Sequence, residues 1–468
     1  MVAGLTVLSA GQDQPVQSQP VQSSADVASR APAAALSTMA GMQNGVGTED
    51  TGNTLPQIPA LLGGIGISPV FLAELERSNY LRGGLNVSAA YDDNPLLAPG
   101  GASSNTSVSI FPNISIEESS SRMRWKLGYA GGLTINRSLA NQNQDSQNLN
   151  FDSQYRLSPH VNLRVAENFS LVTGFFDAGN GAGIISSGGP NASLITPLST
   201  LRSSGTTVET NYHFALNDLM GASGSFYDLH FSNVSNPSAG TQTIPLTDSQ
   251  TASGSAFWLH RIFGADWGGI SYRFDRLTFN SGGGESRVHS FLAVDTLNLS
   301  KRVTLTGFIG PQYSDNQGIA PPATQSTESS GWSVAGGAEG GWRDERTSVS
   351  AGYSRSISDG GGVLGSVRLQ SVHVNFRREL RPGWVASLNV LHGTNDELIG
   401  PPGSASSINL TSAGVSLERN VGKSIGLRFG YSHDVQEEFF VAPASTQDAH
   451  RNRFYATLSY QWAKPLGM

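Results

Sequence analysis

Charged side chains at alternate positions are the residues of this sequence whose spacing could do chemistry. Arg122, Arg124 and Lys126 are separated by single residues, Met123 and Trp125. Because residues i and i+2 of a β-strand point to the same face, these cations would form a ladder. Cations opposite carboxylates on a pore wall can select solutes by charge, whereas the same groups could simply pair and stiffen the wall. The candidate charges on such faces are Arg122, Arg124, Lys126, Asp152, Arg156, Arg164, Glu209, Asp228, Arg273, Asp275, Arg428 and Arg453.

Catalytic, metal-binding and cofactor-binding patterns are weak in this chain. It has no cysteine, which excludes thiolate zinc sites and cysteine nucleophiles. The nine histidines are scattered without the spacing of a metal site. The glycine triplets at 282–284 and 360–362 lack the lysine that follows a phosphate-binding loop, which is typical of hairpin tips. We therefore expect no metal, no cofactor and no enzymatic activity.

The composition bounds the class of protein. Only 14% of the 468 residues are charged, against about 25% in ordinary soluble domains. Glycine, with 55 residues, and small polar residues take the place of the missing charge. A net charge of −7 gives no reason to expect a nucleic-acid partner. The longest apolar stretch, residues 58–73, is broken by Pro59 and Pro69, so we expect no membrane-spanning helix.

The elements that must position the charges are β-strands. From Leu81 onward, runs of about ten to fifteen residues alternate apolar and polar side chains and are punctuated by Gly, Ser, Asn, Asp or Pro. We count about 18 such strands, within a range of about 16–20. Short turns alternate with longer connections, among them 316–330 and 435–449. The longest, 177–204, could constrict a pore or be an exposed loop.

These strands favour a membrane barrel over a soluble β-sandwich, which we keep as the alternative. They are longer than the about 5–6 residues usual in globular sheets and long enough to cross hydrocarbon. Their polar faces carry charges that a dry core would leave unpaired but a water-filled lumen can solvate. Because lipid offers no hydrogen-bond partners, such a sheet must close. We expect an all-β fold, a single transmembrane up-and-down antiparallel β-barrel.

Two segments resemble known outer-membrane barrels. The last strand places Phe454, Leu458, Tyr460 and Trp462 on one face and resembles the terminal strand by which such barrels are recognised for assembly. A final aromatic residue normally closes that strand, whereas here 463–468 follow it. The first strand ends in Tyr-Asp-Asp-Asn (91–94), which resembles the opening strand of poorly characterised barrels associated with exopolysaccharide loci. The resemblance implies a porin-like or polysaccharide-associated barrel in the outer membrane of a Gram-negative bacterium.

The chain before the strands divides into three segments. Residues 1–10 contain an apolar run ending in small residues, which we interpret as a truncated signal segment or a small apolar patch. Residues 11–57 are rich in Gln, Ser and Pro and are typical of a disordered tail. Residues 58–80 form a short lead-in that could contain a periplasmic or plug helix. Residues 81–468 form the expected barrel.

Two functions follow from these expectations. The first is a passive channel for small hydrophilic solutes. The second is a non-conducting barrel for polysaccharide export or for surface binding and assembly. The expected partners are outer-membrane lipid and lipopolysaccharide, the barrel-assembly machinery, and small hydrophilic solutes or polysaccharide.

Overall fold

Eighteen β-strands make up the described part of the computed structural model. That part comprises residues 79–95, 104–138, 143–174, 199–233, 246–263, 266–280, 284–319, 326–362, 364–398, 407–422, 424–441 and 444–466. The expectations for residues 1–10, 11–57 and 58–78 therefore lie outside it. No helix occurs among the described residues, and so none that is long and apolar enough to cross a membrane.

The strands follow one another along the chain as an antiparallel series. The first nine are β1 (Tyr80–Asp92), β2 (Asn105–Ser119), β3 (Met123–Asn136), β4 (Gln144–Arg156), β5 (Val161–Gly174), β6 (Ser199–Ala215), β7 (Asp218–Asn233), β8 (Ser249–Phe263) and β9 (Asp266–Phe279). The second nine are β10 (Gly284–Leu297), β11 (Val303–Ile319), β12 (Ser326–Arg343), β13 (Thr347–Gly360), β14 (Leu364–Arg381), β15 (Trp384–Glu397), β16 (Ser407–Val421), β17 (Ile425–Val441) and β18 (Ala444–Pro465).

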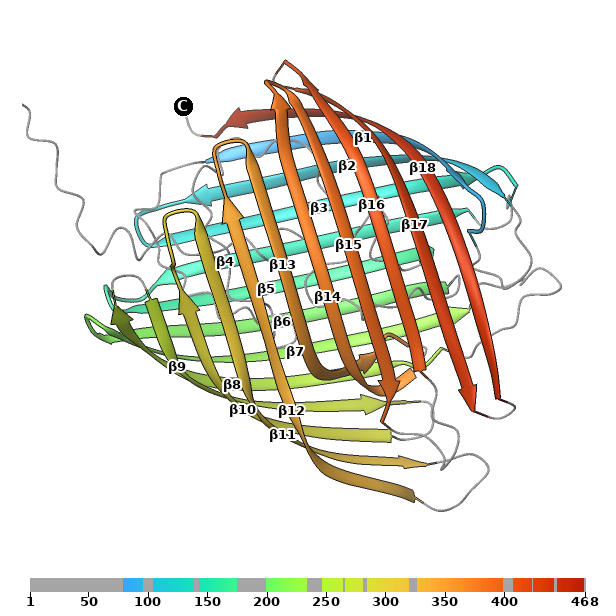
Figure 1. The fold of residues 1–468 in the computed structure, drawn as a ribbon. Helices are drawn as coiled ribbons and strands as arrows, with labels where there is room; N and C mark the ends of the chain where they lie inside the picture. The colour runs from blue at the N-terminus through green and yellow to red at the C-terminus, as the bar shows by residue number, and fades with distance from the viewer. Residues whose placement is uncertain are drawn as a thin grey trace, which may run out of the picture.

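The sheet closes on itself (Figure 1). Each strand pairs with its neighbours in sequence, and β1 also pairs with β18 from Tyr80↔Pro465 to Asp92↔Arg453. Closure leaves no open edge at this seam, which is what a sheet in lipid requires. The expectation of one closed antiparallel all-β barrel of about 18 strands is confirmed.

The two ends of the barrel differ in their connections. The end that holds Tyr80 and Pro465 carries short turns, such as those between β6 and β7 and between β14 and β15. We call it the short-turn end, and the opposite one the loop end. Two connections at the loop end are shorter than the sequence suggested, because β11 and β12 extend to Ile319 and Ser326, and β17 and β18 to Val441 and Ala444. Polar side chains there are compatible with paired strands that have water on both faces.

Contacts across the lumen identify the inner face of the sheet. Ser286 on β10 lies 3.3 Å, Oγ to Oγ, from Ser366 on β14, four strands away. Such a contact can only pass through the interior, so Ser286 points inward. The register and the two-residue alternation then assign every other position. The outer face carries exposed large apolar side chains, as at Val108, Ile110 and Ile114 of β2.

Small hydroxyl side chains link neighbouring strands on the inner face. Ser170 and Ser203 lie 2.7 Å apart, Oγ to Oγ, and Ser223 and Ser255 lie 2.6 Å apart. Such cross-strand pairs satisfy buried polar groups within the wall. These serines, which belong to the small polar residues that are abundant in the sequence, therefore link neighbouring strands on the inner face of the barrel.

The closure seam between β18 and β1 is held by a buried ion pair near the loop end. Arg451 lies with its Nε 2.9 Å from Asp92 Oδ2 and 3.9 Å from Asp434 Oδ2. The Arg451 side chain is 3% exposed and that of Asp434 is 2% exposed. On the other face, Asn452 donates to Asp93 from its backbone N and from Nδ2, each at 2.6 Å.

We predict that Arg451→Met lowers the free energy of unfolding by about 3–5 kcal/mol, because two carboxylates then lose their buried cation. Urea unfolding of the refolded barrel, followed by tryptophan fluorescence, measures this change. The matched control is Arg302→Met, which removes an exposed pair between the β10–β11 turn and Asp344 in the neighbouring β12–β13 turn and should cost about 1 kcal/mol or less. Equal losses for the two variants would show that the seam does not depend on Arg451.

Candidate functional site

A charged patch on the inner wall begins with one arginine between two carboxylates. Arg164 on β5 lies between Asp152 on β4 and Glu209 on β6, because the register places these three positions on adjacent strands. Its Nε and Nη2 donate to Asp152 Oδ2 at 2.8 and 2.6 Å. Its Nη1 lies 3.5 Å from Glu209 Oε2. One cation therefore holds two acidic side chains in fixed positions.

The patch continues onto β2 and β3. Arg124 Nε donates to Glu117 Oε1 at 3.0 Å. Lys126, two residues further along β3, is exposed and is in register with both Glu117 and Asp152. Both carboxylates are already engaged by arginines, and no ion pair to Lys126 occurs within the described strands. Lys126 therefore presents its charge to the lumen.

A recess of about 430 Å³ opens over this patch. Its lining includes Arg124, Lys126, Asp152, Arg164 and Glu209, together with neutral polar side chains and Tyr227 from β7. It lies toward the short-turn end, because Arg124 and Arg164 stand within four residues of the starts of their strands. The recess offers charges of both signs to a passing solute, and Lys126 is the cation there that no ion pair engages within the described strands.

The other inner charges mostly pair within the wall. Arg273 and Asp275 of β9 are buried, with Nη2 and Oδ1 2.6 Å apart, and Ser253 Oγ donates to the same Oδ1 at 2.5 Å. Arg428 of β17 donates to Glu418 of β16 at 2.7 Å. Arg156 and Arg453 are also on the inner face, by the register of β4 and β18. Most of these charges therefore pair within the wall, whereas Lys126 in the recess has no ion pair within the described strands.

Two sequence-predicted residues lie away from the inner wall. Arg122 is in the short turn before β3. Asp228 is on the outer face of β7, where it accepts from Gln250 Nε2 at 3.0 Å and lies 4.0 Å from Arg202 Nη2. The cause is the sequence around Phe226 and Tyr227, in which apolar side chains stand on both faces and hide the alternation. Asp228 therefore contributes nothing to a pore wall.

The β13–β14 hairpin bends into the mouth at the loop end, and this bend was not predicted from the sequence. Pairing between β12 and β13 stops at Gly336↔Arg355, and the two ribbons then diverge (Figure 1). Beyond this point Ile357 packs with Leu277 and Val288 on the inner faces of β9 and β10. The hairpin therefore leaves the wall and lies against the inner face of β9 and β10.

The tip of this hairpin is fixed by two further contacts. The carbonyl of Gly362 accepts a hydrogen bond from Thr247 N at 2.7 Å. Gly362 has a φ of +85°, and a Cβ there would lie 2.5 Å from the ring of Phe231 on β7. Glycine is thus required by both backbone and space. The glycine triplet at 360–362 marked the tip in the sequence, but nothing local showed that it turns inward.

The constriction proposed for 177–204 lies almost wholly outside the described residues, which resume at Ser199 in β6. Within the described residues, it is the β13–β14 hairpin that narrows the lumen.

The terminal-strand aromatic and leucine side chains are exposed on the outer face of β18, next to β1. This set is Phe454, Leu458, Tyr460 and Trp462. Among the described residues, no group of three or more His, Cys, Asp or Glu side chains is placed so that it could hold a metal ion.

We predict that Ser286→Cys with Ser366→Cys forms a disulfide on mild oxidation, because the two Oγ atoms are 3.3 Å apart. The chain has no cysteine of its own, so loss of free thiols reports this bond alone. The control, Ser290→Cys with Ser366→Cys, moves one partner about 13 Å along β10 and should stay reduced. Equal oxidation of both pairs would show that the hairpin is not held at one position against β10.

Comparisons with known proteins give a likeness of fold alone. No family model matches the chain, and no curated protein matches its sequence. OpdQ of Pseudomonas aeruginosa has a TM-score of 0.41 and 12% identity, over 83% of this chain and 98% of its own. OccAB4 of Acinetobacter baumannii has a TM-score of 0.43 and 10% identity, over 82% and 98%. The siderophore receptor PiuA of the same species has a TM-score of 0.42 and 8% identity, over 87% and 85%.

Proposed function

We propose that the protein is a bacterial outer-membrane barrel that acts as a passive channel for small hydrophilic solutes. One observation carries this proposal: the inner face of β2–β6 is polar and forms an open charged recess, while the outer face is apolar. A sheet with these two faces suits lipid outside and water inside. A barrel of about 16–18 strands is wide enough for an aqueous channel.

The proposed solute path passes two features of the inner surface. At the loop end the β13–β14 hairpin occupies part of the mouth, held by Ile357 and Ser366 against the inner face of β9 and β10. Toward the short-turn end the solute meets the recess between Arg124 and Glu209. The hairpin would restrict solute size, and the recess would act on solute charge. A wide unselective pore is therefore not what we propose.

Lys126 determines whether we expect the recess to favour anionic or cationic solutes. Arg124 pairs with Glu117, and Arg164 pairs with both Asp152 and Glu209, so the three cations and three carboxylates of the patch balance. Lys126 is the cation of the patch that no ion pair engages within the described strands, and its charge faces the lumen. We therefore propose a modest preference for anionic solutes. The buried Arg273–Asp275 pair adds no net charge.

The surroundings of the barrel follow from the same proposal. The exposed apolar outer face would contact membrane lipid and lipopolysaccharide. The terminal strand, with Tyr460 and Trp462 on its outer face, would be recognised by the barrel-assembly machinery. Absence of conductance from the refolded barrel would instead favour the non-conducting alternative, in which it serves polysaccharide export or surface binding.

We predict that Lys126→Glu moves the reversal potential of the channel in a salt gradient toward cation selectivity. A change of about 1 kcal/mol, the Coulomb energy of two charges about 4 Å apart in water, corresponds to an about fivefold change in permeability ratio. Planar-bilayer recording measures it.

The matched control is Lys464→Glu, the same substitution on the outer face of β18 near the short-turn end. It should leave the reversal potential unchanged. If both variants conduct and their reversal potentials shift equally, Lys126 does not lie on the solute path. The absence of any conductance would overturn the proposal of a channel.

A further inference from the structure

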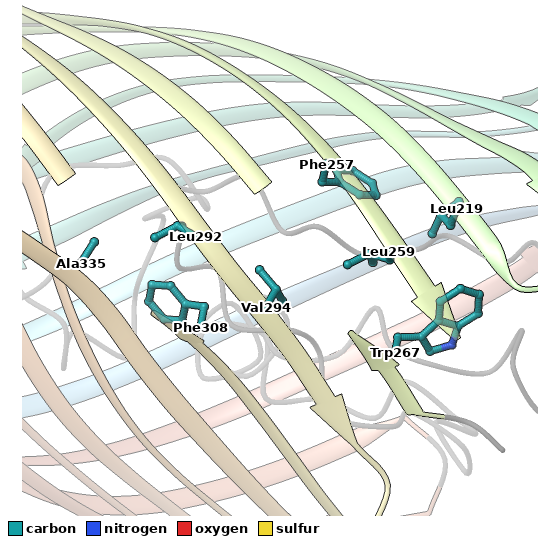
Figure 2. Close-up of a cluster of buried hydrophobic side chains, with 8 residues drawn as sticks. All are labelled: Leu219, Phe257, Leu259, Trp267, Leu292, Val294, Phe308 and Ala335. Atoms are coloured by element: carbon teal, nitrogen blue, oxygen red, sulfur yellow. The ribbon is translucent and has the colours of Figure 1, made fainter. Parts of the chain in front are cut away.

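The inner face of the barrel carries two kinds of surface, and only one of them is open to a solute. Across β7–β12 a packed apolar cluster reaches from Leu219 to Ala335 (Figure 2). Leu219, Leu259 and Leu292 in this cluster are at most 3% exposed, so it offers a solute no surface. The charged recess on β3–β7 is open, with a volume of about 430 Å³. This volume is within the range of about 300–1,000 Å³ that is usual for small-ligand sites.

The hollow of the recess comes from small side chains at its centre. Ala166 on β5 and Thr207 on β6 are in register and both face the lumen. The next inward positions toward the short-turn end are Arg164 and Glu209, and the next on β5 toward the loop end is Asn168. Longer polar side chains therefore surround a centre of one methyl group and one hydroxyl-bearing side chain.

The loop-end border of the recess carries an aromatic ring and an amide. A Cβ on Gly205 would overlap the Tyr227 ring, so this ring leans from β7 over β6. Its hydroxyl lies 3.1 Å from Thr207 Oγ1. Asn150 is exposed and leans over Gly128, where a Cβ would lie 2.6 Å from its Oδ1. The border thus combines an aromatic surface with a neutral group that both donates and accepts hydrogen bonds.

A fixed acceptor and a cation stand side by side on β3 and β4. Arg164 donates twice to Asp152 Oδ2, and Asp152 Oδ1 accepts no hydrogen bond from the described strands. The Asp152 side chain is 34% exposed, so this oxygen can be reached from the lumen. Lys126 is in register with Asp152 and is exposed. The arginine holds the acceptor in position before a ligand arrives, which lowers the cost of binding.

These groups match a solute that has both a carboxylate and hydroxyl groups. A neutral polyol would leave the Lys126 ammonium without an anionic partner. A carboxylate without hydroxyl groups would leave Asp152 Oδ1 and the Asn150 amide without donors or acceptors. A doubly charged anion would be repelled by Asp152 and Glu209. One negative charge on a hydroxylated ring uses every group that faces the recess.

We propose that the recess is a binding site for a monosaccharide acid, a hydroxylated ring that carries one carboxylate, such as glucuronate. Lys126 binds the carboxylate, Asp152 Oδ1 and Asn150 bind ring hydroxyl groups, and the Tyr227 ring packs against C–H groups of the sugar. This inference deepens the proposed channel function and rests on it for access of the solute to the lumen.

The test is calorimetric titration of the refolded full chain, in detergent micelles, with three probes. Glucuronate carries both recognition features, glucose lacks the carboxylate, and cyclohexanecarboxylate lacks the hydroxyl groups. Glucuronate should bind about tenfold or more tightly than either of the others, because each of them loses hydrogen bonds to a charged group. Equal affinities for glucuronate and cyclohexanecarboxylate would overturn the sugar specificity.

Two variants locate the site. Ala166→Phe fills the hollow and should weaken glucuronate binding about tenfold or more. Its matched control, Ser416→Phe, adds the same side chain on the inner face of β16, two residues before Glu418, and should leave binding unchanged. Lys126→Gln should lower the affinity for glucuronate to that for glucose. Heat-modifiable migration on gels verifies that each variant folds, and unchanged binding by folded Ala166→Phe would overturn the assignment of the recess.

Planar-bilayer recording on the same preparations separates this inference from the channel proposal. Conductance without glucuronate binding would overturn the sugar site and leave the channel. Glucuronate binding that Ala166→Phe weakens, in a barrel that does not conduct, would support the sugar site and overturn the channel.

Discussion

Backbone hydrogen bonding is the constraint on which the rest of this barrel depends. In lipid an unpaired N–H or C=O group finds no partner, so every strand needs two neighbours. The chain meets this requirement with eighteen antiparallel pairings, the last of them between β1 and β18. The buried Arg451 with its carboxylates reinforces that closing pair at the loop end. The pairing of β12 with β13 stops at Gly336↔Arg355, and this split is where the requirement is locally relaxed. The inward-bending hairpin lies beside it.

Two regions of the inner surface differ in their chemistry. On β2–β6 small hydroxyl groups and ion pairs surround the recess that contains Lys126. On β7–β12 leucine, valine and aromatic side chains form the apolar cluster that ends at Ala335. Both regions obey the same two-residue alternation, and only the choice of inward residue differs. One closed sheet can therefore carry a solvated polar recess and a buried apolar cluster on the same face.

The sequence predicted the fold more fully than the site. Alternation, turn residues and strand length are local properties, and they were sufficient for the fold class and for the inward positions of Arg164 and Glu209. Asp228 was misplaced because Phe226 and Tyr227 are both apolar and conceal which face is which. The inward hairpin depends on contacts between β14 and β10, about eighty residues apart, and no local pattern encodes them. Ala335 and Leu292 look like any alternating apolar residues until the closed register shows that they point inward.

Hydrogen exchange of the backbone amides across the split is the most direct measurement of this arrangement. In the refolded barrel, the amides of Gly336–Trp342 that pair with β13 should be protected. On Gly331–Ala335, the alternate amides that face away from β11 should exchange rapidly, as should those of Ile357–Asp359 that face away from β14. Uniform slow exchange from Gly331 through Trp342 would show that β12 and β13 are paired along their length, and it would contradict both the split and the inward hairpin.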